Sequence, residues 1–549
     1  MSLPEIGSLE SLSLAELREL VGVLMGEVRR LQADNQALRD EVARLKGLPP
    51  RPPLRPSGME KATGAASSGK TGRRSRRRRG VKRDRDAVTA EVVLTASVPG
   101  GSRFKGYQDI LVRDLRLSAE VVRYRRERWV TPSGETVVAR LPAGIVGGFG
   151  PALRRFILAA HVQGQVTTER LVALLTGIGV AISKRQVVRL LTGSLNTFIE
   201  EDHAVLQAGL ATARWITVDD TAARHGHADG FTTQVGDDRF TAFRTGPSKS
   251  RQAFLSLLRA GHTGYVINDA ALGVMRGLSL AGPLLARLAA HPAKRFADEA
   301  TWTAHLTALG ISQLDVTPDP VRVATEGALW GAIRDQGLLT NTVIVSDGAR
   351  QFRVGTHPCG GFPNLLRRSR TQASSALCWV HAERLVHKLV PATPAQRRAI
   401  ETTQSLIWWF YADLKSWKRD LCPRRAAALR ARFDRIFRRR TGYLTLDRLM
   451  ARLHRQKADL LRVLQHPDIP LHTNGSENDI RSCVTKRKIS GGTVSDRGRT
   501  ARNVMLGLMK TCAKLGVSFF RYLGDRLNLP SGTAVPPLPD LVRQAQAAM

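Results

Sequence analysis

Apolar residues recur every seven positions near the start of the chain, which is the pattern of a coiled coil. One set of positions holds leucine and the other mostly valine: Leu17, Leu24, Leu31, Leu38 and Leu45, then Leu14, Val21, Val28, Asn35 and Val42. β-Branched residues in the second set favour a coiled coil of two parallel helices, and a single buried asparagine fixes their register. We predict that residues 1–47 form a coiled coil that joins copies into a homodimer or a higher oligomer.

Residues 48–90 carry no pattern that could form a core, because proline, glycine and serine lead into a run of arginines. A run of like charge is usually a solvated, disordered segment. In a basic chain it also suits sequence-independent contacts with phosphates. We predict a linker whose DNA-binding side chains include Arg73, Arg74, Arg76 and Arg77.

Two smaller units are predicted before residue 209. Short extended runs at 121–125, 128–130 and 135–139 predict a small β module over residues 91–145, with Pro132-Ser-Gly134 as a hairpin turn between the last two. Residues 146–208 carry helical patterns, and Ser183 is a good cap for a basic helix after a glycine-containing turn. This order resembles a helix-turn-helix, although two helices that merely pack together would give the same pattern. The side chains it would present to DNA are Lys184, Arg185 and Arg189.

From residue 209 the pattern changes to strands and helices, and several strands end in an aspartate. Apolar runs precede Asp219 and Asp347, and a shorter run precedes Asp269. Each aspartate alone has an ordinary explanation as a turn former or a helix cap. Carboxylates that converge without His or Cys companions suit Mg²⁺, which prefers oxygen ligands, rather than zinc.

A further acidic candidate, Glu477, lies in a basic segment. Asn474-Gly-Ser476 is a turn with helix-capping residues, which places Glu477 in the first turn of a helix. Basic residues follow at Arg481, Lys486, Arg487 and Lys488. A long helical stretch precedes this segment and is predicted as an insertion at about 380–470. Near its start, Cys378 and His381 are interpreted as side chains that pack beside the site rather than as metal ligands.

The composition indicates a polyanionic partner. The chain of 549 residues has 84 Lys and Arg against 47 Asp and Glu, a formal net charge of +37. Nucleic acid is the first candidate for a protein of this charge. We see no signal peptide, lipidation motif or long apolar run, so no membrane partner is expected. The five cysteines form neither a disulfide framework nor a paired zinc motif, which favours the cytoplasm.

Three motifs in order resemble the insertion sequence sixty-six family of DDE transposases. Asp219-Asp-Thr221 is similar to the family's first catalytic motif, and Cys378-Trp-Val-His-Ala-Glu-Arg384 is similar to its Cys-Trp-x-His-Ala-x-Arg signature. Asn474-Gly-Ser-Glu-Asn-Asp-Ile-Arg481, followed by Lys-Ile-Ser-Gly-Gly492, resembles its glutamate block. The coiled coil at the N-terminus also matches, so the resemblance covers nearly the whole chain.

The resemblance implies an α/β, ribonuclease-H-like catalytic domain at residues 209–525 with a large helical insertion, and a tail at 526–549. It implies that Asp219, Asp347 and Glu477 are the catalytic residues and bind two Mg²⁺ ions, with Mn²⁺ as a substitute. Asp269 stays open as the alternative second acid, because it also ends a strand shortly after the first motif. The remaining basic residues would hold DNA phosphates, and the side chains expected to support the metal ligands are Cys378, His381 and Asn474.

The implied function is a bacterial transposase that binds the ends of an insertion sequence and catalyses DNA strand cleavage and transfer. Its expected partners are double-stranded DNA at the element ends and the target, a second copy of the chain, and accessory proteins of the same element. The expected location is the cytoplasm, at the nucleoid. Two alternatives stay open: a DNA-binding regulator or inactive transposase relic, and a structure-specific, metal-dependent nuclease.

Overall fold

The computed structural model describes residues 26, 30, 88, 90–353, 374–529 and 534–547. The coiled coil predicted for residues 1–47, apart from positions 26 and 30, lies outside the described residues. So do the linker arginines, from Arg73 to Arg77. Both remain predictions.

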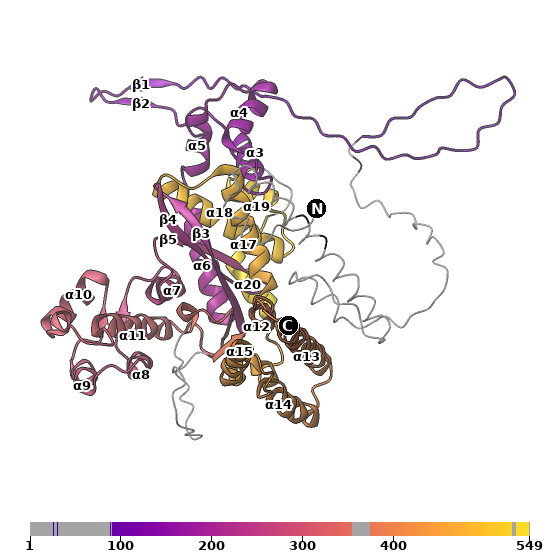
Figure 1. The fold of residues 1–549 in the computed structure, drawn as a ribbon. Coiled ribbons are helices and arrows are strands. Elements are labelled where there is room, and N and C mark those ends of the chain that lie inside the picture. Colours follow the sequence, from indigo (N-terminus) through magenta and orange to yellow (C-terminus); the bar gives the residue numbers. More distant parts are fainter. Residues whose placement is uncertain are drawn as a thin grey trace, which may run out of the picture.

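A mixed five-stranded sheet lies at the centre of the fold, in the order β5-β4-β3-β8-β9 (Figure 1). Strands β3 (Trp215–His225), β4 (Ala228–Gly236) and β5 (Thr241–Gly246) are antiparallel. Strands β8 (Val343–Ser346) and β9 (Ser374–Leu377) run parallel to β3. The predicted α/β character is therefore confirmed, and the two strands expected before Asp219 and Asp347 are direct neighbours.

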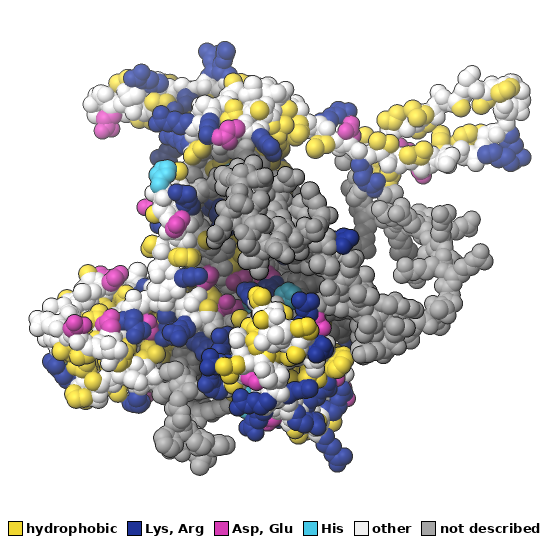
Figure 2. Space-filling view, viewed as in Figure 1, with side chains coloured by type: hydrophobic (Ala, Val, Ile, Leu, Met, Phe, Trp, Pro, Cys, Tyr) yellow, Lys and Arg dark blue, Asp and Glu magenta, His cyan; other side chains and the backbone are white. Residues whose placement is uncertain are grey.

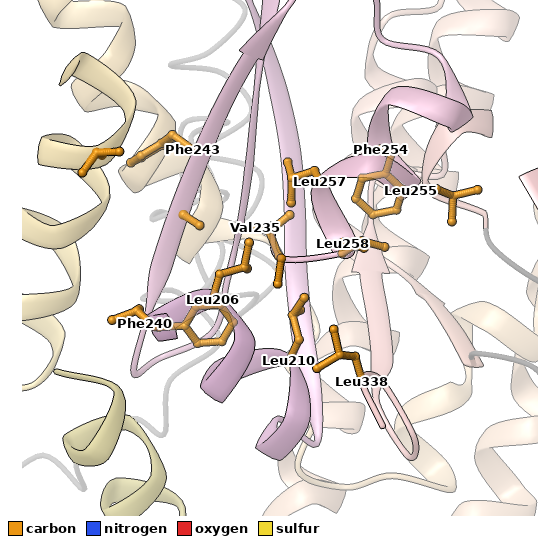
Figure 3. Close-up of a cluster of buried hydrophobic side chains, with 14 of the residues drawn as sticks. Leu206, Leu210, Val235, Phe240, Phe243, Phe254, Leu255, Leu257, Leu258 and Leu338 are labelled. Atoms are coloured by element: carbon orange, nitrogen blue, oxygen red, sulfur yellow. The ribbon is translucent and has the colours of Figure 1, made fainter. Parts of the chain in front are cut away.

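Helix α6 (Asn196–Thr212) packs against the antiparallel part of the sheet and builds much of its core (Figure 3). Leu206 and Val235 are fully buried there, and burial of such a side chain contributes about 1.5–3 kcal/mol. The helix approaches closely because it carries Gly209, where a Cβ atom would lie 2.4 Å from Cε1 of Phe240.

The last helices complete this core. Helix α17 (Asn474–Ser490) packs on β3 and β4, and α18 (Asp496–Lys514) packs on β5. Helix α19 (Phe519–Arg526) follows, and α20 (Leu538–Ala547) packs on α6 with Leu538 and Val542 fully buried. Helix α20, in the stretch expected as a tail at 526–549, therefore contributes to the core.

Two helical units extend from the sheet, one between β5 and β8 and one after β9, its last strand. The second, between β9 and α17, forms a core together with β8 and β9. It occupies the stretch expected to be helical: α12 (Trp379–His387), α13 (Pro394–Arg419), α14 (Pro423–Phe437), α15 (Leu444–Arg455) and α16 (Lys457–Leu460). The first, between β5 and β8, was not predicted as a unit: α7 (Arg251–Leu258), β6 (Tyr265–Val266), α8 (Asp269–Gly277), α9 (Gly282–Ala290), β7 (Arg295–Phe296), α10 (Glu299–Ala308) and α11 (Pro320–Asp335).

Three helices precede α6: α3 (Pro151–Val162), α4 (Thr168–Gly177) and α5 (Lys184–Thr192). All three occur where the hydrophobic pattern predicted helices. The buried Arg154 of α3 donates hydrogen bonds to the carbonyls of Leu190, Gly193 and Ser194 at the end of α5. This arginine satisfies carbonyls that a helix end leaves without partners, and it thereby fixes α5 against α3.

The region expected as a small β module holds one hairpin within residues 90–145, between β1 (Arg128–Val130) and β2 (Thr136–Val138). The extended run expected at 121–125 is not a strand, and many of its apolar neighbours are exposed (Figure 2). The physical reason is that no other element of the described chain packs on these residues, so no sheet forms around them.

Candidate active site

Asp219 and Asp347 lie on two neighbouring parallel strands. Asp347 directly follows the end of β8, but Asp219 lies within β3, which continues to His225, so the expectation that this strand ends at Asp219 is wrong. Strands β3 and β8 are paired with Thr217 opposite Val345, and each aspartate follows its member of this pair by two residues. A step of two residues along a strand returns to the same face, and neighbouring strands lie about 4.8 Å apart. The register therefore directs both carboxylates to one face of the sheet.

Helix α17 brings Glu477 to this same face. Ser476 Oγ donates a hydrogen bond of 2.6 Å to Thr217 Oγ1, and both side chains are buried. Thr217 shares its face of β3 with Asp219, two residues further on. The first turn of α17 is thus held against the strand that carries Asp219, and Glu477 follows directly.

The start of α12 is held between β8 and α17. The N–H of Cys378 donates to the carbonyl of Ser346, and the N–H of Trp379 donates to the carbonyl of Leu471, both at 2.9 Å. Trp379 is fully buried in the core of the second helical unit. The Cys-Trp-Val-His-Ala-Glu-Arg segment therefore joins the helical unit to the carboxylates.

Arg384 of α12 forms a bidentate contact with the carboxylate of Glu477. Its two terminal nitrogens donate to Glu477 Oε1 at 3.1 Å and Oε2 at 3.4 Å. His381 lies on the same side, with Nε2 3.8 Å from Oε1. Sequence reasoning did not single out Arg384 as a site residue, although this arginine ends the Cys-Trp-x-His-Ala-x-Arg signature.

The buried Cys378 and the partly exposed His381 form a pair beside Glu477. Burial alone would raise the pKa of the Cys378 thiol, but hydrogen bonds with His381 and Thr473 outweigh it and lower that pKa. Burial alone would lower the pKa of His381, but Cys378 and Glu477 raise it. Asn474, which begins α17, donates from its N–H to Nδ1 of His472 at 3.3 Å. These residues shape the surroundings of Glu477.

The charges of Asp347 and Glu477 act on the carboxylate of Asp219. The pKa of Asp219 is raised to about 6, first by burial and further by the charges of Asp347 and Glu477. The N–H of Asp220 and the charge of His381 act in the opposite direction without cancelling the effect. A site that gathers like charges in this way is one that a cation would stabilise.

Asp220, which follows Asp219, is contacted by side chains from other parts of the chain. Gln351 donates to Asp220 Oδ2 at 2.8 Å, and Lys249 Nζ lies 3.6 Å from Asp220 Oδ1. After Asp347 the chain turns at Gly348, whose φ of +92° favours glycine. The N–H of Ala349 donates to Asp347 Oδ1 at 2.9 Å. Gln351 and Lys249 carried no motif in the sequence, so they were missed.

Asp269 lies in a different part of the fold. It is the first residue of α8 and follows β6, which pairs with β7 in a separate two-stranded sheet. The strand that precedes Asp269 therefore does not adjoin β3. A strand ending in aspartate was visible in the sequence, but the sheet to which it belongs was not.

The three carboxylates have the right ligand atoms for a divalent cation that prefers oxygen, but they are not yet close enough together to bind one. Asp219, Asp347 and Glu477 offer only carboxylate oxygens, the ligands that Mg²⁺ prefers. Across the described part of the chain, however, no three His, Cys, Asp or Glu side chains are grouped closely enough to hold a metal ion. The carboxylate of Glu477 instead contacts the guanidinium of Arg384.

The basic residues expected to contact DNA differ in exposure. Arg481 and Lys488 are exposed on α17, and Arg487 is partly exposed. Lys486 is buried, and its ammonium donates to the carbonyl of His161 at 2.6 Å. Burial, with Arg502 nearby, lowers the pKa of Lys486 to about 8. The expectation that Lys486 holds a phosphate is not met, because helical periodicity turns it into the core with Ser476 and Asp479.

On α5, the basic residues share the solvent face. Lys184, Arg185 and Arg189 are exposed, whereas Val187, Leu190 and Leu191 are buried against the neighbouring helices. Ser183 caps the helix as expected, since its side chain accepts from the N–H of Gln186. Lys184 forms an ion pair with Glu169 of α4.

Comparison with known proteins assigns the chain to a family. A model described as "Transposase IS66 family" matches residues 147–278 and 354–501, about half of the chain. The chain belongs to this family of transposases. The matched ranges include Asp219 and Glu477, whereas Asp347 lies in the unmatched interval between them.

A relative in Sinorhizobium fredii (strain NBRC 101917 / NGR234) is similar over a large part of the chain. It is named "Uncharacterized protein y4jO" and is 54% identical over 338 residues, which are 62% of this chain and 99% of that protein. That name assigns no activity. Within the described residues, none of the helices has the length and apolar character needed to cross a membrane.

Proposed function

We propose that the protein is a DDE transposase, with Asp219, Asp347 and Glu477 as its catalytic and metal-binding residues on a ribonuclease-H-like domain. The observation that carries this proposal is the register of β3 and β8, which directs two aspartates to the face where α17 delivers the glutamate. Membership of a transposase family supports the same reaction. The register favours Asp347 over Asp269 as the second acid, because β6 belongs to another sheet.

The chain's own residues would hold the metal and position the glutamate. Two Mg²⁺ ions, with Mn²⁺ as a substitute, would activate a water or a DNA 3′-hydroxyl and stabilise the leaving oxygen. Asp219 and Asp347 would bind from the sheet, and Glu477 would complete the site from α17. Arg384 orients Glu477 until a cation competes for that carboxylate, so Glu477 must give up or share this contact when the metal binds.

Two described surfaces would hold the DNA phosphates. On α17, Arg481 and Lys488 lie four and eleven residues after Glu477 and continue along its side of the helix. On α5, Arg185 and Arg189 face solvent with Lys184. Contacts of this kind position the duplex without reading its sequence. The linker arginines and a coiled-coil dimer that brings two element ends together are further parts of the proposal.

The test is strand cleavage of a labelled duplex that carries one end of the element flanking the gene. We expect wild type to release a 3′-hydroxyl end with Mg²⁺ but not with a chelator. Glu477→Gln and Asp347→Asn should bind the duplex with unchanged affinity and cut at least about 100-fold more slowly, since each removes a ligand carboxylate. Asp269→Asn is the matched control and should cut like wild type.

Other outcomes would favour the alternatives. Because Glu477 is paired with Arg384, a DNA-binding relic without activity is the second candidate. Equal binding by all variants and no cutting by any, even with the other proteins of the element added, would support that reading. Cutting without a joined product would instead indicate a metal-dependent nuclease.

A further inference from the structure

A basic hollow lies beyond the carboxylates, where the hairpin of β3 and β4 meets the turn between α17 and α18. Its walls include Thr221 and Ala223 of β3, Arg487 of α17, and Arg499 and Arg502 of α18, with Arg224 beside them. Its enclosed part measures about 20 Å³, about enough room for one water molecule, and the rest of the opening is exposed to solvent. Four arginines from three elements thus border one opening.

The turn that closes the hollow depends on Gly491-Gly492. Gly491 has a φ of +67°, and a Cβ atom on Gly492 would lie 2.5 Å from the carbonyl oxygen of Arg224. Next to it, the N–H of Thr493 donates to the carbonyl of Arg224 at 2.9 Å. The glycine pair therefore lets the turn lie directly on β3, which fixes one wall.

The positive charge in the hollow is mostly uncompensated. Arg499 pairs with Asp496 at 2.8 Å, but no carboxylate within the described ranges lies at salt-bridge distance from Arg224, Arg487 or Arg502. Arg502 instead donates to the carbonyls of Gly491 and Gly492 at 3.0 and 3.3 Å. Guanidinium groups held without acidic partners suit a phosphate, which accepts several hydrogen bonds at once.

The hollow and the carboxylates share one face of β3. Thr221 and Ala223 follow Asp219 at steps of two, so they lie on its side of the strand, whereas Arg224 alternates to the other side and borders the hollow from there. Arg487 lies ten residues after Glu477 on α17, which corresponds to about 15 Å along a helix. At 3.4 Å per nucleotide of a duplex strand, this separation spans about four nucleotides.

We propose that this hollow binds a backbone phosphate of the DNA, about four nucleotides from the bond that is cut, and so sets the register of the strand in the site. The proposal rests on the proposed function, because it takes the ligand to be the DNA substrate. Arg224 and Arg487 would contact one and the same phosphate from two sides.

The test is the salt dependence of binding to a fluorescein-labelled 30-base-pair duplex, measured by anisotropy with the full chain. Each phosphate contact contributes about 0.9 to the slope of log affinity against log salt concentration. We expect Arg224→Gln and Arg487→Gln each to lower the slope by about 0.9, and the double variant to lower it by the same amount, because both arginines serve one phosphate. Arg287→Gln, an exposed position on α9, is the matched control and should leave the slope unchanged.

The failures are distinguishable. If the single variants keep the wild-type slope, or if their losses add in the double variant, the hollow is not a one-phosphate site and the proposed function is untouched. If wild type binds no duplex at any salt concentration, the proposed function fails and the hollow proposal fails with it. Thermal melting shows whether each variant is folded. If Arg224→Gln does not melt cooperatively, the salt slope of Arg487→Gln alone tests the proposal.

Discussion

At Asp219, burial and two neighbouring carboxylates act in the same direction and hold the pKa at about 6. The charged form of this side chain therefore costs folding free energy when no cation is present. At Glu477, the ion pair with Arg384 lowers the cost of the charged carboxylate, but no comparable partner reaches Asp219 within the described part of the chain. A buried carboxylate that lowers the stability of the folded protein is typical of a residue kept for function.

Replacement of Asp219 by Asn should stabilise the metal-free protein, and more so at higher pH. The folded-state pKa is raised, so the folded state holds the proton more tightly and wild-type stability falls as pH rises from about 4 to about 6. Asn does not titrate. In the presence of a chelator, we expect the free energy of unfolding of Asp219→Asn to be about 1–3 kcal/mol higher than that of wild type above pH 6. Near pH 4 this difference should disappear. Urea unfolding at both pH values measures it, and a pH-independent difference would contradict the repulsion.

Loss of the guanidinium at Arg384 should slow cleavage without weakening DNA binding. Residues that orient a metal ligand typically change activity about 10–100-fold when replaced, and we expect Arg384→Gln to fall in this range. Arg397→Gln, an exposed position on α13, controls for the lost charge. Single-turnover cleavage and anisotropy separate the two effects. An equal fall in affinity would show instead that Arg384 contacts the DNA.

At the scale of elements, α17 is the piece that completes the site, and buried polar contacts fix its position. Asp479 is buried, and its Oδ2 accepts from Lys514 Nζ and from Thr241 Oγ1, both at 2.7 Å. Lys486 adds its bond to His161 on α3. Together with the Ser476–Thr217 contact, these bonds hold α17 to the sheet, to α18 and to α3. The backbone of Glu477 is therefore fixed in position.

Removal of the Asp479 carboxylate should destabilise the protein strongly. Asp479→Ala leaves the ammonium of Lys514 without its buried partner, which typically costs about 3–5 kcal/mol. Asp496→Ala is the matched control, because Asp496 is mostly exposed and its pair with Arg499 should contribute at most about 1 kcal/mol. Thermal melting of both variants checks this. Similar melting temperatures would show that α17 is held by its apolar contacts alone.

At the scale of the whole molecule, the sequence pattern predicted local elements better than their arrangement. The strands before Asp219 and Asp347 were predictable because their apolar residues are fully buried in the sheet. The assignment of Asp269 to another sheet was not, because strand pairing joins residues far apart in the chain. Lys486 appeared to belong to a solvated run of charge, yet its place on the helix turns it inward. Arg384 reaches Glu477 across 93 residues, which no local pattern records.

The central claim is that Asp219, Asp347 and Glu477 together bind a divalent cation, and Mn²⁺ binding followed by electron paramagnetic resonance tests it most directly. This measurement needs neither DNA nor accessory proteins. We predict saturable Mn²⁺ binding by wild type and by Asp269→Asn, and a loss of affinity of at least about tenfold in Asp219→Asn, Asp347→Asn and Glu477→Gln, because each loses a ligand carboxylate. Equal Mn²⁺ affinity in wild type and all three carboxylate variants would contradict the account.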